Sequence, residues 1–369
     1  MSTATQFDAA QATWLVAVRE IESRLRSKPF LISTAFLILL ALAGVVTTAL
    51  VATSNADGYR VAVTRDALPR VESVQGLRIT EVPDTGEAER LVRDGTVEAA
   101  IVADGASPVG LVIVADTETP AVLQGMLSVA PDVRLLNPPP ADAPDVALRY
   151  LVALAFGLMF LMSASLFGTM IAQSVVEEKQ TRIVEILLAA ITSRSLMAGK
   201  VVGNTILALA QIVVFALIGV LGLGLTGQLG VLVGLSASLA WFVVFFLFGF
   251  VLLAALYSAA GALVSRQEDV GATTFPLMLL VVAPYMLVVL LNDNPVALTV
   301  LSYIPFSAPV AMPTRLYLFA SGTAWWEPLT ALLILVATCV GTVLVSARVY
   351  SSSLLKMGGR VKLAEALRS

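Results

Sequence analysis

Six long apolar stretches run through this chain of 369 residues, and they restrict its possible folds more than any other feature. A helix needs about 20 mostly apolar residues to cross the hydrocarbon core of a bilayer. Inside lipid, a helix also pairs its own backbone polar groups. The stretches that are long enough to span are 30–51, 150–175, 197–223, 239–264, 270–291 and 328–346. The pattern predicts an α-helical polytopic membrane protein with six transmembrane helices.

Composition excludes an ordinary soluble enzyme. Hydrophobic residues make up 58% of the chain and charged residues 13%, against about 25% charged residues in an average soluble domain. Histidine is absent and Cys339 is the single cysteine, which excludes a structural zinc site, a Cys–His nucleophile and an internal disulfide. The pair Gly199-Lys200 lacks the upstream glycine of a phosphate-binding loop. We therefore expect no catalytic residue in this chain, and no metal or cofactor bound by it.

Lysines and arginines are distributed unevenly between the two sides of the predicted helices. If the N-terminus is cytoplasmic, the inner segments hold 14 of them, and the short outer loops hold only Arg315. Basic residues close to membrane spans stay preferentially on the cytoplasmic side. We therefore predict that both termini are cytoplasmic, with segment 1–29 before the first span and a basic tail at 347–369.

Segment 1–29 contains the pattern of an amphipathic helix. Four apolar residues recur at helical spacing between charged ones, namely Trp14, Val18, Ile21 and Leu25. A helix of this kind with a basic bias is suited to lying in the inner membrane interface. The alternative is a cytoplasmic helix that packs on the protein's own loops.

Segment 52–147, between the first two spans, differs from the rest of the chain in charge. It holds 15 Asp and Glu against 7 Arg, a local charge of −8, while the remainder carries +5. Thr85 and Thr119 are the expected helix N-caps. The residue patterns predict strands at 59–63, 77–82, 97–103, 110–115 and 133–136, and helices at 87–93 and 119–129. We expect a small extracytoplasmic α/β domain, because long domains cross the membrane largely regardless of charge.

The stretch 177–194 joins the second and third spans on the predicted cytoplasmic side. Glu178 and Arg182 are spaced as an i, i+4 pair, and Arg182 and Glu185 as an i, i+3 pair. An apolar stripe follows the same helical spacing and consists of Ile183, Ile186, Leu187 and Ala190. The stretch predicts a short charged helix with one apolar face, which is typical of a docking surface. A solvated loop is the alternative.

Residues of this stretch also resemble those of a known family. The pattern Glu-Glu-Lys-x-x-Arg-x-x-Glu-x-Leu-Leu, with Gly-Lys entering the next span, is similar to that of permease subunits of ABC exporters of the sodium-efflux NatB kind. The matching residues are Glu177, Glu178, Lys179, Arg182, Glu185, Leu187, Leu188, Gly199 and Lys200. The N-terminal helix and the large outer domain are similar to that family as well. One departure is Ala190-Ile191, where the family often has a proline.

The resemblance implies a non-catalytic permease subunit of an ATP-driven exporter, a multi-pass protein of a bacterial plasma (inner) membrane. A separate ATPase subunit, which binds ATP and Mg, would dock on a coupling helix at 177–194. The implied docking residues are Glu177, Glu178, Lys179, Arg182, Glu185, Leu187 and Leu188. A second permease chain, identical or different, would help to enclose the path through the five-helix region 148–346. No nucleic acid partner is expected.

Prolines recur every four residues before the last span, at Pro305, Pro309 and Pro313. A continuous membrane helix tolerates this spacing poorly, and broken backbone at membrane depth needs protein or a cavity to shield it. We predict an outer re-entrant or interfacial segment that acts as a gate, with Phe306 and Arg315 also matching the family. The alternative is an outer loop with an aromatic belt.

Polar residues inside the predicted spans are few. Gln173, Asn204 and Gln211 are candidates for lining a substrate path, although hydrogen bonds between helices are the usual role of such residues. Two other classes of function remain open from the residues alone. One is a secondary transporter or channel, and the other is a membrane receptor or scaffold with a ligand-binding outer domain.

Overall fold

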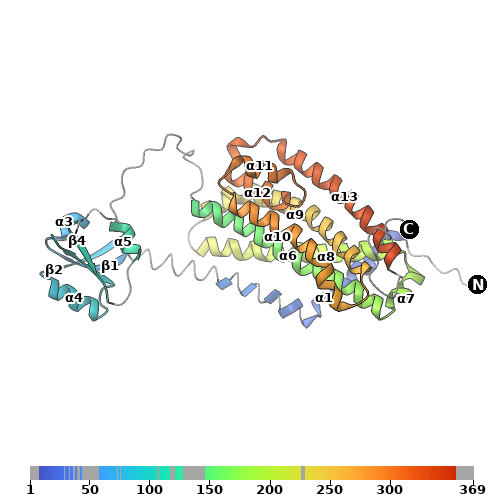
Figure 1. Ribbon diagram of the computed structural model, residues 1–369, viewed down its shortest axis with the longest axis horizontal. Coiled ribbons are helices and arrows are strands. Elements are labelled where there is room, and N and C mark those ends of the chain that lie inside the picture. The colour runs from blue at the N-terminus through green and yellow to red at the C-terminus, as the bar shows by residue number, and fades with distance from the viewer. Residues whose placement is uncertain are drawn as a thin grey trace, which may run out of the picture. The chain divides into compact units, whose positions relative to one another are not determined.

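The computed structural model of the protein describes residues 8–28, 58–72, 76–105, 109–116, 121–127, 146–225 and 229–354, with isolated positions at 30–43, 74 and 107. The chain forms two compact units (Figure 1). One unit is Leu42–Pro139, and the other combines Met1–Ala41 with Pro140–Ser369. Each unit is described by itself below.

Long apolar helices build the larger unit. Five of its described helices contain a segment that is long and apolar enough to cross a membrane, in agreement with five of the six predicted stretches. The sixth stretch, 30–51, lies largely outside the described residues, and the positions described between 30 and 43 are helical. The five helices are α6 (Val146–Gln180), α8 (Ser193–Leu225), α9 (Leu229–Leu263), α10 (Val270–Leu290) and α13 (Glu327–Ser353).

The centre of this bundle is the contact between α6 and α9. Phenylalanine rings of the two helices pack there, stacked in the pair Phe156–Phe242 and edge to face in the pair Phe160–Phe246. Glycines allow close approach, because a Cβ at Gly168 would lie 2.5 Å from the ring of Tyr257. Aromatic pairs of this kind add about 0.5–1.5 kcal/mol beyond the area that they bury. The α6–α9 contact therefore holds the bundle together along most of its length.

Short elements close the two ends of the bundle. Figure 1 shows α7 at one end, and α11 and α12 at the other. The chain order agrees with this arrangement, because α7 joins α6 to α8, and α11 and α12 join α10 to α13 after the chain has run through α8, α9 and α10. The bounds are α7 (Ile183–Ala190), η1 (Gln267–Asp269), α11 (Pro295–Tyr303), α12 (Ala308–Leu318) and η2 (Ala320–Gly322).

The N-terminal helix α1 (Ala9–Leu25) packs along the first half of α8. A Cβ at Gly199 would lie 2.4 Å from Cβ of Val16, and one at Gly203 would lie 2.8 Å from the carbonyl oxygen of Ala17. Glycines four residues apart let two helices approach this closely. The helix therefore packs on the bundle itself. The alternative prediction, that it packs on the protein's own loops, was wrong.

The buried stripe of α1 only partly agrees with the predicted apolar one, of which Ile21 packs on the main core and Val18 is half-buried. Ala12, Val16, Ala17 and Glu20 are buried, whereas Trp14 is 55% exposed and Leu25 51% exposed. Gly199 and Gly203 let the two helix backbones approach closely, so that Val16, Ala17 and Glu20 lie directly against α8. Trp14 and Leu25 are thus on a different side of α1 from the bundle contact, and the interfacial interpretation remains a prediction for that side.

The smaller unit contains a four-stranded sheet in the order β2-β1-β3-β4. Strand β1 pairs in parallel with β2 and with β3, and β3 pairs antiparallel with β4. The strands are β1 (Tyr59–Thr64), β2 (Leu77–Val82), β3 (Ala99–Ala103) and β4 (Leu111–Val114). Alternate residues of β1 point to opposite faces, so that Val61 belongs to one core and Ala62 to the other.

Helices cover both faces of this sheet. Ala88 and Val92 of α4 (Thr85–Arg93) join the core on one face, and Val71 of α3 (Leu68–Val71) and Leu123 of α5 (Ala121–Leu127) join the other. The N-cap of α4 is Asp84, whose carboxylate accepts a hydrogen bond from the backbone nitrogen of Glu87 at 2.9 Å. The prediction of Thr85 as the cap was therefore wrong by one residue. The expected cap Thr119 and the expected strand 133–136 lie outside the described residues.

Candidate functional site

The stretch 177–194 forms three elements and not the single helix that its spacing predicts. Helix α6 continues to Gln180, and Arg182 then adopts a left-handed backbone conformation with φ of 57°. The chain turns there, and α7 runs from Ile183 to Ala190. Thr192 then accepts a hydrogen bond from the backbone nitrogen of Ser195 at 3.1 Å, in the first turn of α8. The turn at Arg182 separates the first three predicted docking residues from the others.

Helix α7 buries one side against the bundle and exposes the other. Val184 is fully buried in a core with Leu196 and Tyr350, and Leu187 and Leu188 pack partly into the same core. The opposite side, which we call the α7 face, consists of exposed Arg182, Ile183, Glu185, Ile186 and Ala189. Ile186 is 75% exposed, a large fraction for an isoleucine. The predicted stripe is therefore divided, with Leu187 facing the bundle and Ile183 and Ile186 facing outward.

Two of the predicted docking residues lie inside the bundle. Lys179 is 2% exposed, and its ammonium donates hydrogen bonds to the carbonyl oxygens of Ala262 at 3.0 Å and Ser353 at 3.1 Å. These carbonyls belong to the ends of α9 and α13, where backbone acceptors lack helical partners. Lys179 thus ties three helices together. Of the Glu-Glu-Lys triplet, only Glu177 is exposed.

Glu178 belongs to a buried group that we call the three-helix ion cluster, formed by Glu20 of α1, Glu178 of α6 and Lys200 of α8. The ammonium of Lys200 lies 2.7 Å from Oε1 of Glu20 and 3.0 Å from Oε2 of Glu178. Lys200 is fully buried. The predicted pair of Glu178 with Arg182 does not form, because Glu178 is directed toward Lys200.

Neighbouring groups complete the three-helix ion cluster. Lys200 also donates to Oγ of Ser174 at 2.5 Å, and Arg19 contacts Glu178. Arg24 donates to the carbonyl oxygen of Met170 at 2.8 Å. Burial raises the pKa of Glu20, but the nearby charge and hydrogen bond of Lys200, with Arg24 and Arg19, outweigh it, so that the net pKa lies below its ordinary value. Glu20 is therefore a carboxylate at neutral pH.

The sequence interpretation missed this cluster, although one signal of it was present. Lys200 falls inside the predicted span 197–223, and a lysine within an apolar span is rare unless it is paired. Its partner Glu20 lies 180 residues away along the chain. No local spacing connects the two, so only the packing of α1 on α8 identifies the pair.

The proline segment forms two short helices at the opposite end of the bundle. Pro305 lies in the turn between α11 and α12, Pro309 in the first turn of α12, and Pro313 inside α12. Helices of 9 and 11 residues are too short to cross a bilayer. Gly249 of α9 leaves space for Pro309, since a Cβ there would lie 2.4 Å from the proline ring. The gate remains a prediction.

Arg315, predicted for the outer face, is buried in an ion pair. Its Nη1 lies 2.5 Å from Oε2 of Glu327, the first residue of α13. Oε1 of Glu327 accepts a hydrogen bond from the backbone nitrogen of Ala324 at 3.0 Å. Phe306, in the turn before α12, is half-buried and packs on the main core of the bundle. The pair links the end of α12 to the start of α13.

The three polar residues proposed to line a path occupy different environments. Gln173 is exposed, and its carbonyl oxygen accepts a hydrogen bond from Gln267 at 3.1 Å. Asn204 is fully buried and donates to the carbonyl oxygen of Lys200 at 2.9 Å. Gln211 is buried as well. The structure does not bring the three residues together.

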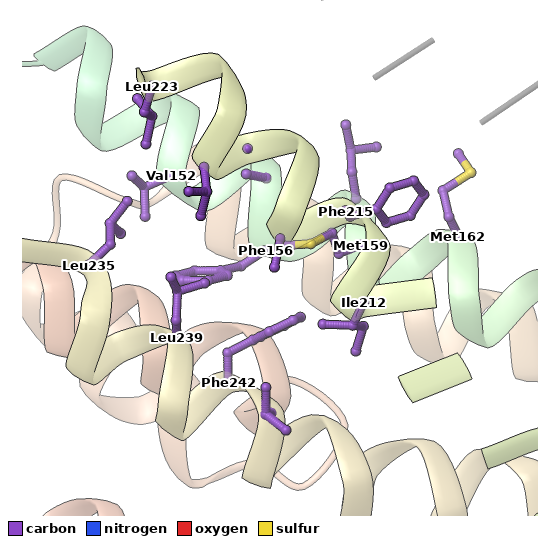
Figure 2. A pocket seen from close by; sticks show the side chains of 16 residues that line it. Val152, Phe156, Met159, Met162, Ile212, Phe215, Leu223, Leu235, Leu239 and Phe242 are labelled. Atoms are coloured by element: carbon purple, nitrogen blue, oxygen red, sulfur yellow. The ribbon is translucent and has the colours of Figure 1, made fainter. Parts of the chain in front are cut away.

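A cavity of about 560 Å³ lies between α6, α8 and α9. Figure 2 shows side chains such as Phe156, Ile212 and Phe242 turned toward this space, and the side chains that line it contain only carbon and sulfur. Met159 and Met162 add flexible side chains to the wall, which suit irregular apolar ligands. Gln211 and Asn204 are not among the lining residues. The cavity therefore offers a hydrophobic environment and no side-chain ligand for a bare ion.

Comparisons with known proteins agree with this architecture. Residues 28–348 match the family described as ABC-2 family transporter protein. A Bacillus subtilis (strain 168) protein, named uncharacterized protein YhaP, is 30% identical over 221 residues, which are 56% of this chain and 52% of that protein. A Methanocaldococcus jannaschii protein, named uncharacterized protein MJ1024, is 29% identical over 174 residues, 46% of this chain and 42% of that protein. No solved structure matches.

The chain spans about half the length of these curated relatives. The family match is more extensive, because it begins close to the first predicted span and ends within α13. It includes four of the long helices and most of α13, together with α7, α11 and α12. With apolar helices of spanning length in that same region, the chain is a multi-pass membrane protein that belongs to the ABC-2 family of transporter proteins.

Proposed function

We propose that this chain is the permease subunit of an ATP-driven exporter of the NatB-like kind. It crosses a bacterial plasma membrane with both termini in the cytoplasm, and the unit Leu42–Pro139 lies on the outer side. A separate ATPase subunit binds ATP and Mg and docks on the α7 face. A second permease chain completes the translocation path.

The observation that carries the proposal is the exposed α7 face. Val184 anchors α7 in the core of the bundle. On the opposite side of the helix, Ile183 and Ile186 are exposed next to the charged Arg182 and Glu185. A rigid helix with exposed apolar residues inside a charged rim is typical of a binding surface. Membrane lipid is a poor alternative occupant, because charged side chains occupy the same face.

The three-helix ion cluster supports a coupling role for this end of the bundle. Glu178 lies four residues before the turn at Arg182 and is paired with α8 and α1. We therefore expect a displacement of α7 to move α6, α8 and α1 as well, because buried ion pairs and hydrogen bonds connect these helices. We propose that these contacts make the four helices respond together when the ATPase subunit moves.

The apolar cavity supports a substrate with a hydrocarbon part. A sodium ion that leaves water needs oxygen ligands, and the side chains around the cavity provide none. An apolar or amphiphilic compound gains from the same wall. We therefore propose an apolar or amphiphilic substrate, and not the sodium ion that the NatB-like family exports.

The alternative of a secondary transporter or channel has less support. Such proteins carry acidic or other ionisable groups near the membrane midplane. Within the described parts of the five long helices, Asp and Glu occur only in terminal turns, at Glu177, Glu178 and Glu327. The receptor or scaffold alternative does not account for five spans after the outer unit.

The proposal is tested by purifying the tagged chain from native membranes and measuring the ATPase activity that accompanies it. Ile186→Asp is expected to lower the co-purified activity by about tenfold or more, because it places a charge in the centre of the docking surface. Glu185→Lys, which reverses the rim, has a smaller effect. Both variants are expected to fold normally, since neither side chain is buried.

Matched controls lie elsewhere on the same chain. Val296→Asp changes a 72% exposed apolar residue of α11, at the opposite end of the bundle, and Glu268→Lys reverses an exposed charge of η1. Neither is expected to change the co-purified ATPase activity. Normal recovery with Ile186→Asp would exclude the α7 face as the docking site. Absence of any ATPase activity with the unaltered chain would contradict the proposed function itself.

A further inference from the structure

A second cavity lies between α8, α9 and α13, at the end of the bundle that carries α7. Its volume is about 940 Å³. Arg194 in the first turn of α8 and Arg348 near the end of α13 both line it, together with Ser351. The remainder of the wall is mainly aliphatic, with Val201, Val251 and Val343 from the three helices. The cavity therefore combines a cationic side with an apolar one.

The two arginines have no acidic partner in the described part of the chain. No described carboxylate lies within 4 Å of either guanidinium, whereas Arg19, Arg24 and Arg315 all have one. The backbone around them is held firmly, because Oγ of Ser193 and Oγ of Ser351 lie 2.8 Å apart and join α8 to α13. Two unneutralised guanidinium groups on adjoining helices attract an anion, and a phosphate group most effectively.

We propose that this cavity binds an anionic phospholipid of the inner leaflet. Arg194 and Arg348 hold the phosphate, and the acyl chain lies against the valines of α8, α9 and α13. The assignment to the inner leaflet rests on the proposed topology. Basic cavities between membrane helices on the cytoplasmic side bind anionic head groups in this way.

The apolar wall distinguishes a lipid from a free anion. Inorganic phosphate would use the two arginines only, and it would leave the aliphatic surface of the cavity in contact with water. A phospholipid can place its phosphate at the two arginines and its acyl chain on the aliphatic surface at the same time. Arg266 is the comparison residue, because it is exposed at the same end of the bundle, as Arg194 and Arg348 are, but does not line the cavity.

The test uses the purified full-length chain, stripped of lipid in detergent. Binding of phosphatidylglycerol and of phosphatidylcholine with the same acyl chains is measured by native mass spectrometry. We expect selective retention of phosphatidylglycerol, and a loss of affinity of about tenfold or more in the double variant Arg194→Gln, Arg348→Gln. Arg266→Gln, the matched control, is expected to bind as the unaltered chain does.

A second variant keeps the test informative if the double variant folds poorly. Ala198→Phe fills the apolar wall and retains both arginines, so it is expected to weaken phosphatidylglycerol binding as well. Equal binding of the two lipids, or an equal loss in Arg266→Gln, would overturn the proposal. Competition by inorganic phosphate at lipid-equivalent concentration would show a free-anion site instead. Normal lipid binding with loss of the ATPase subunit in the double variant would show a protein-docking site.

Discussion

Buried charges lie at both ends of the helix bundle, and the two sites are built differently. At the α7 end, Lys200 serves two carboxylates, Glu20 and Glu178, on two other helices. At the opposite end, Arg315 serves a single carboxylate, Glu327, which also accepts a backbone hydrogen bond. The first site joins residues that are 180 positions apart, and the second joins neighbouring elements.

The difference shows where the fold depends on long-range contacts. Removal of Lys200 takes the fully buried ammonium from two carboxylates, which keep contacts with Arg19 and Arg24. Removal of Arg315 affects a single carboxylate, which keeps hydrogen bonds from Ala324 and Tyr303. Breaking a buried ion pair is costly because the remaining charge has no solvent. The α7 end is therefore the more vulnerable of the two, and it is also the end at which we propose that the ATPase subunit docks.

The largest effect is expected from Lys200→Met. This variant should lose about 3–5 kcal/mol of stability, because Glu20 and Glu178 lose their only fully buried cation and keep only their contacts with Arg19 and Arg24. Thermal unfolding of the purified chain in detergent measures the loss. The combined variant Lys200→Met, Glu20→Gln, Glu178→Gln should recover most of it, since both carboxylate charges are removed together with the ammonium. An unchanged midpoint for Lys200→Met would show that the cluster is hydrated and contributes little.

Arg315→Met should cost less, about 1–3 kcal/mol, because Glu327 keeps the backbone donor of Ala324. The same unfolding measurement gives the comparison directly. The double variant Arg315→Met, Glu327→Gln serves as the control, since the amide can still accept from Ala324 and neither charge of the pair remains buried. If Arg315→Met were as damaging as Lys200→Met, the proposed contrast between the two ends would fail.

Acidification should weaken the α7 end in a defined direction. The net pKa of Glu20 is lowered in the folded chain, so its contribution is present above the ordinary carboxyl pKa of 4.5 and is lost as the pH falls through the lower folded value. Stability should therefore decline below about pH 4.5. Glu20→Gln should flatten that part of the pH profile, and a profile identical to that of the unaltered chain would count against the assignment.

The smallest effect is expected for an exposed pair in the smaller unit. Glu87 and Arg90 lie 2.6 Å apart in α4, and the Arg90 hydrogen bond lowers the pKa of Glu87. The Arg90 side chain is 59% exposed and that of Glu87 36% exposed, so solvent screens their attraction. Glu87→Gln should leave thermal unfolding of the chain unchanged within error. A clear shift of the unfolding midpoint would mean that the distance between the two charges, and not their burial, determines how much an ion pair stabilises this chain.

The residue pattern alone identified the long helices and most of the sheet. Five apolar stretches became helices of spanning length, and four short runs became strands at nearly the predicted positions. These features depend on local hydrophobicity and spacing, which the chain carries in consecutive residues. Helix ends were less accurate, since α6 and α13 both extend beyond the predicted spans.

The assignment of charged residues required the tertiary structure. The spacing of Glu178, Arg182 and Glu185 is that of helix pairs, but the turn at Arg182 and the approach of Lys200 separate them. A local pair is worth only a few tenths of a kcal/mol. A buried cation on another helix outweighs it.

The two sides of α7 and of α1 were also decided by packing. Leu187 and Ile186 are adjacent, equally apolar residues, and only the position of the bundle determines that Leu187 is half-buried and Ile186 exposed. In α1, the close approach at Gly199 and Gly203 of α8 places Val16 and Ala17 in the contact, whereas Trp14 and Leu25 stay exposed. Hydrophobic periodicity establishes that a helix has an apolar face, but the shape of the neighbouring helix determines which residues that face contains.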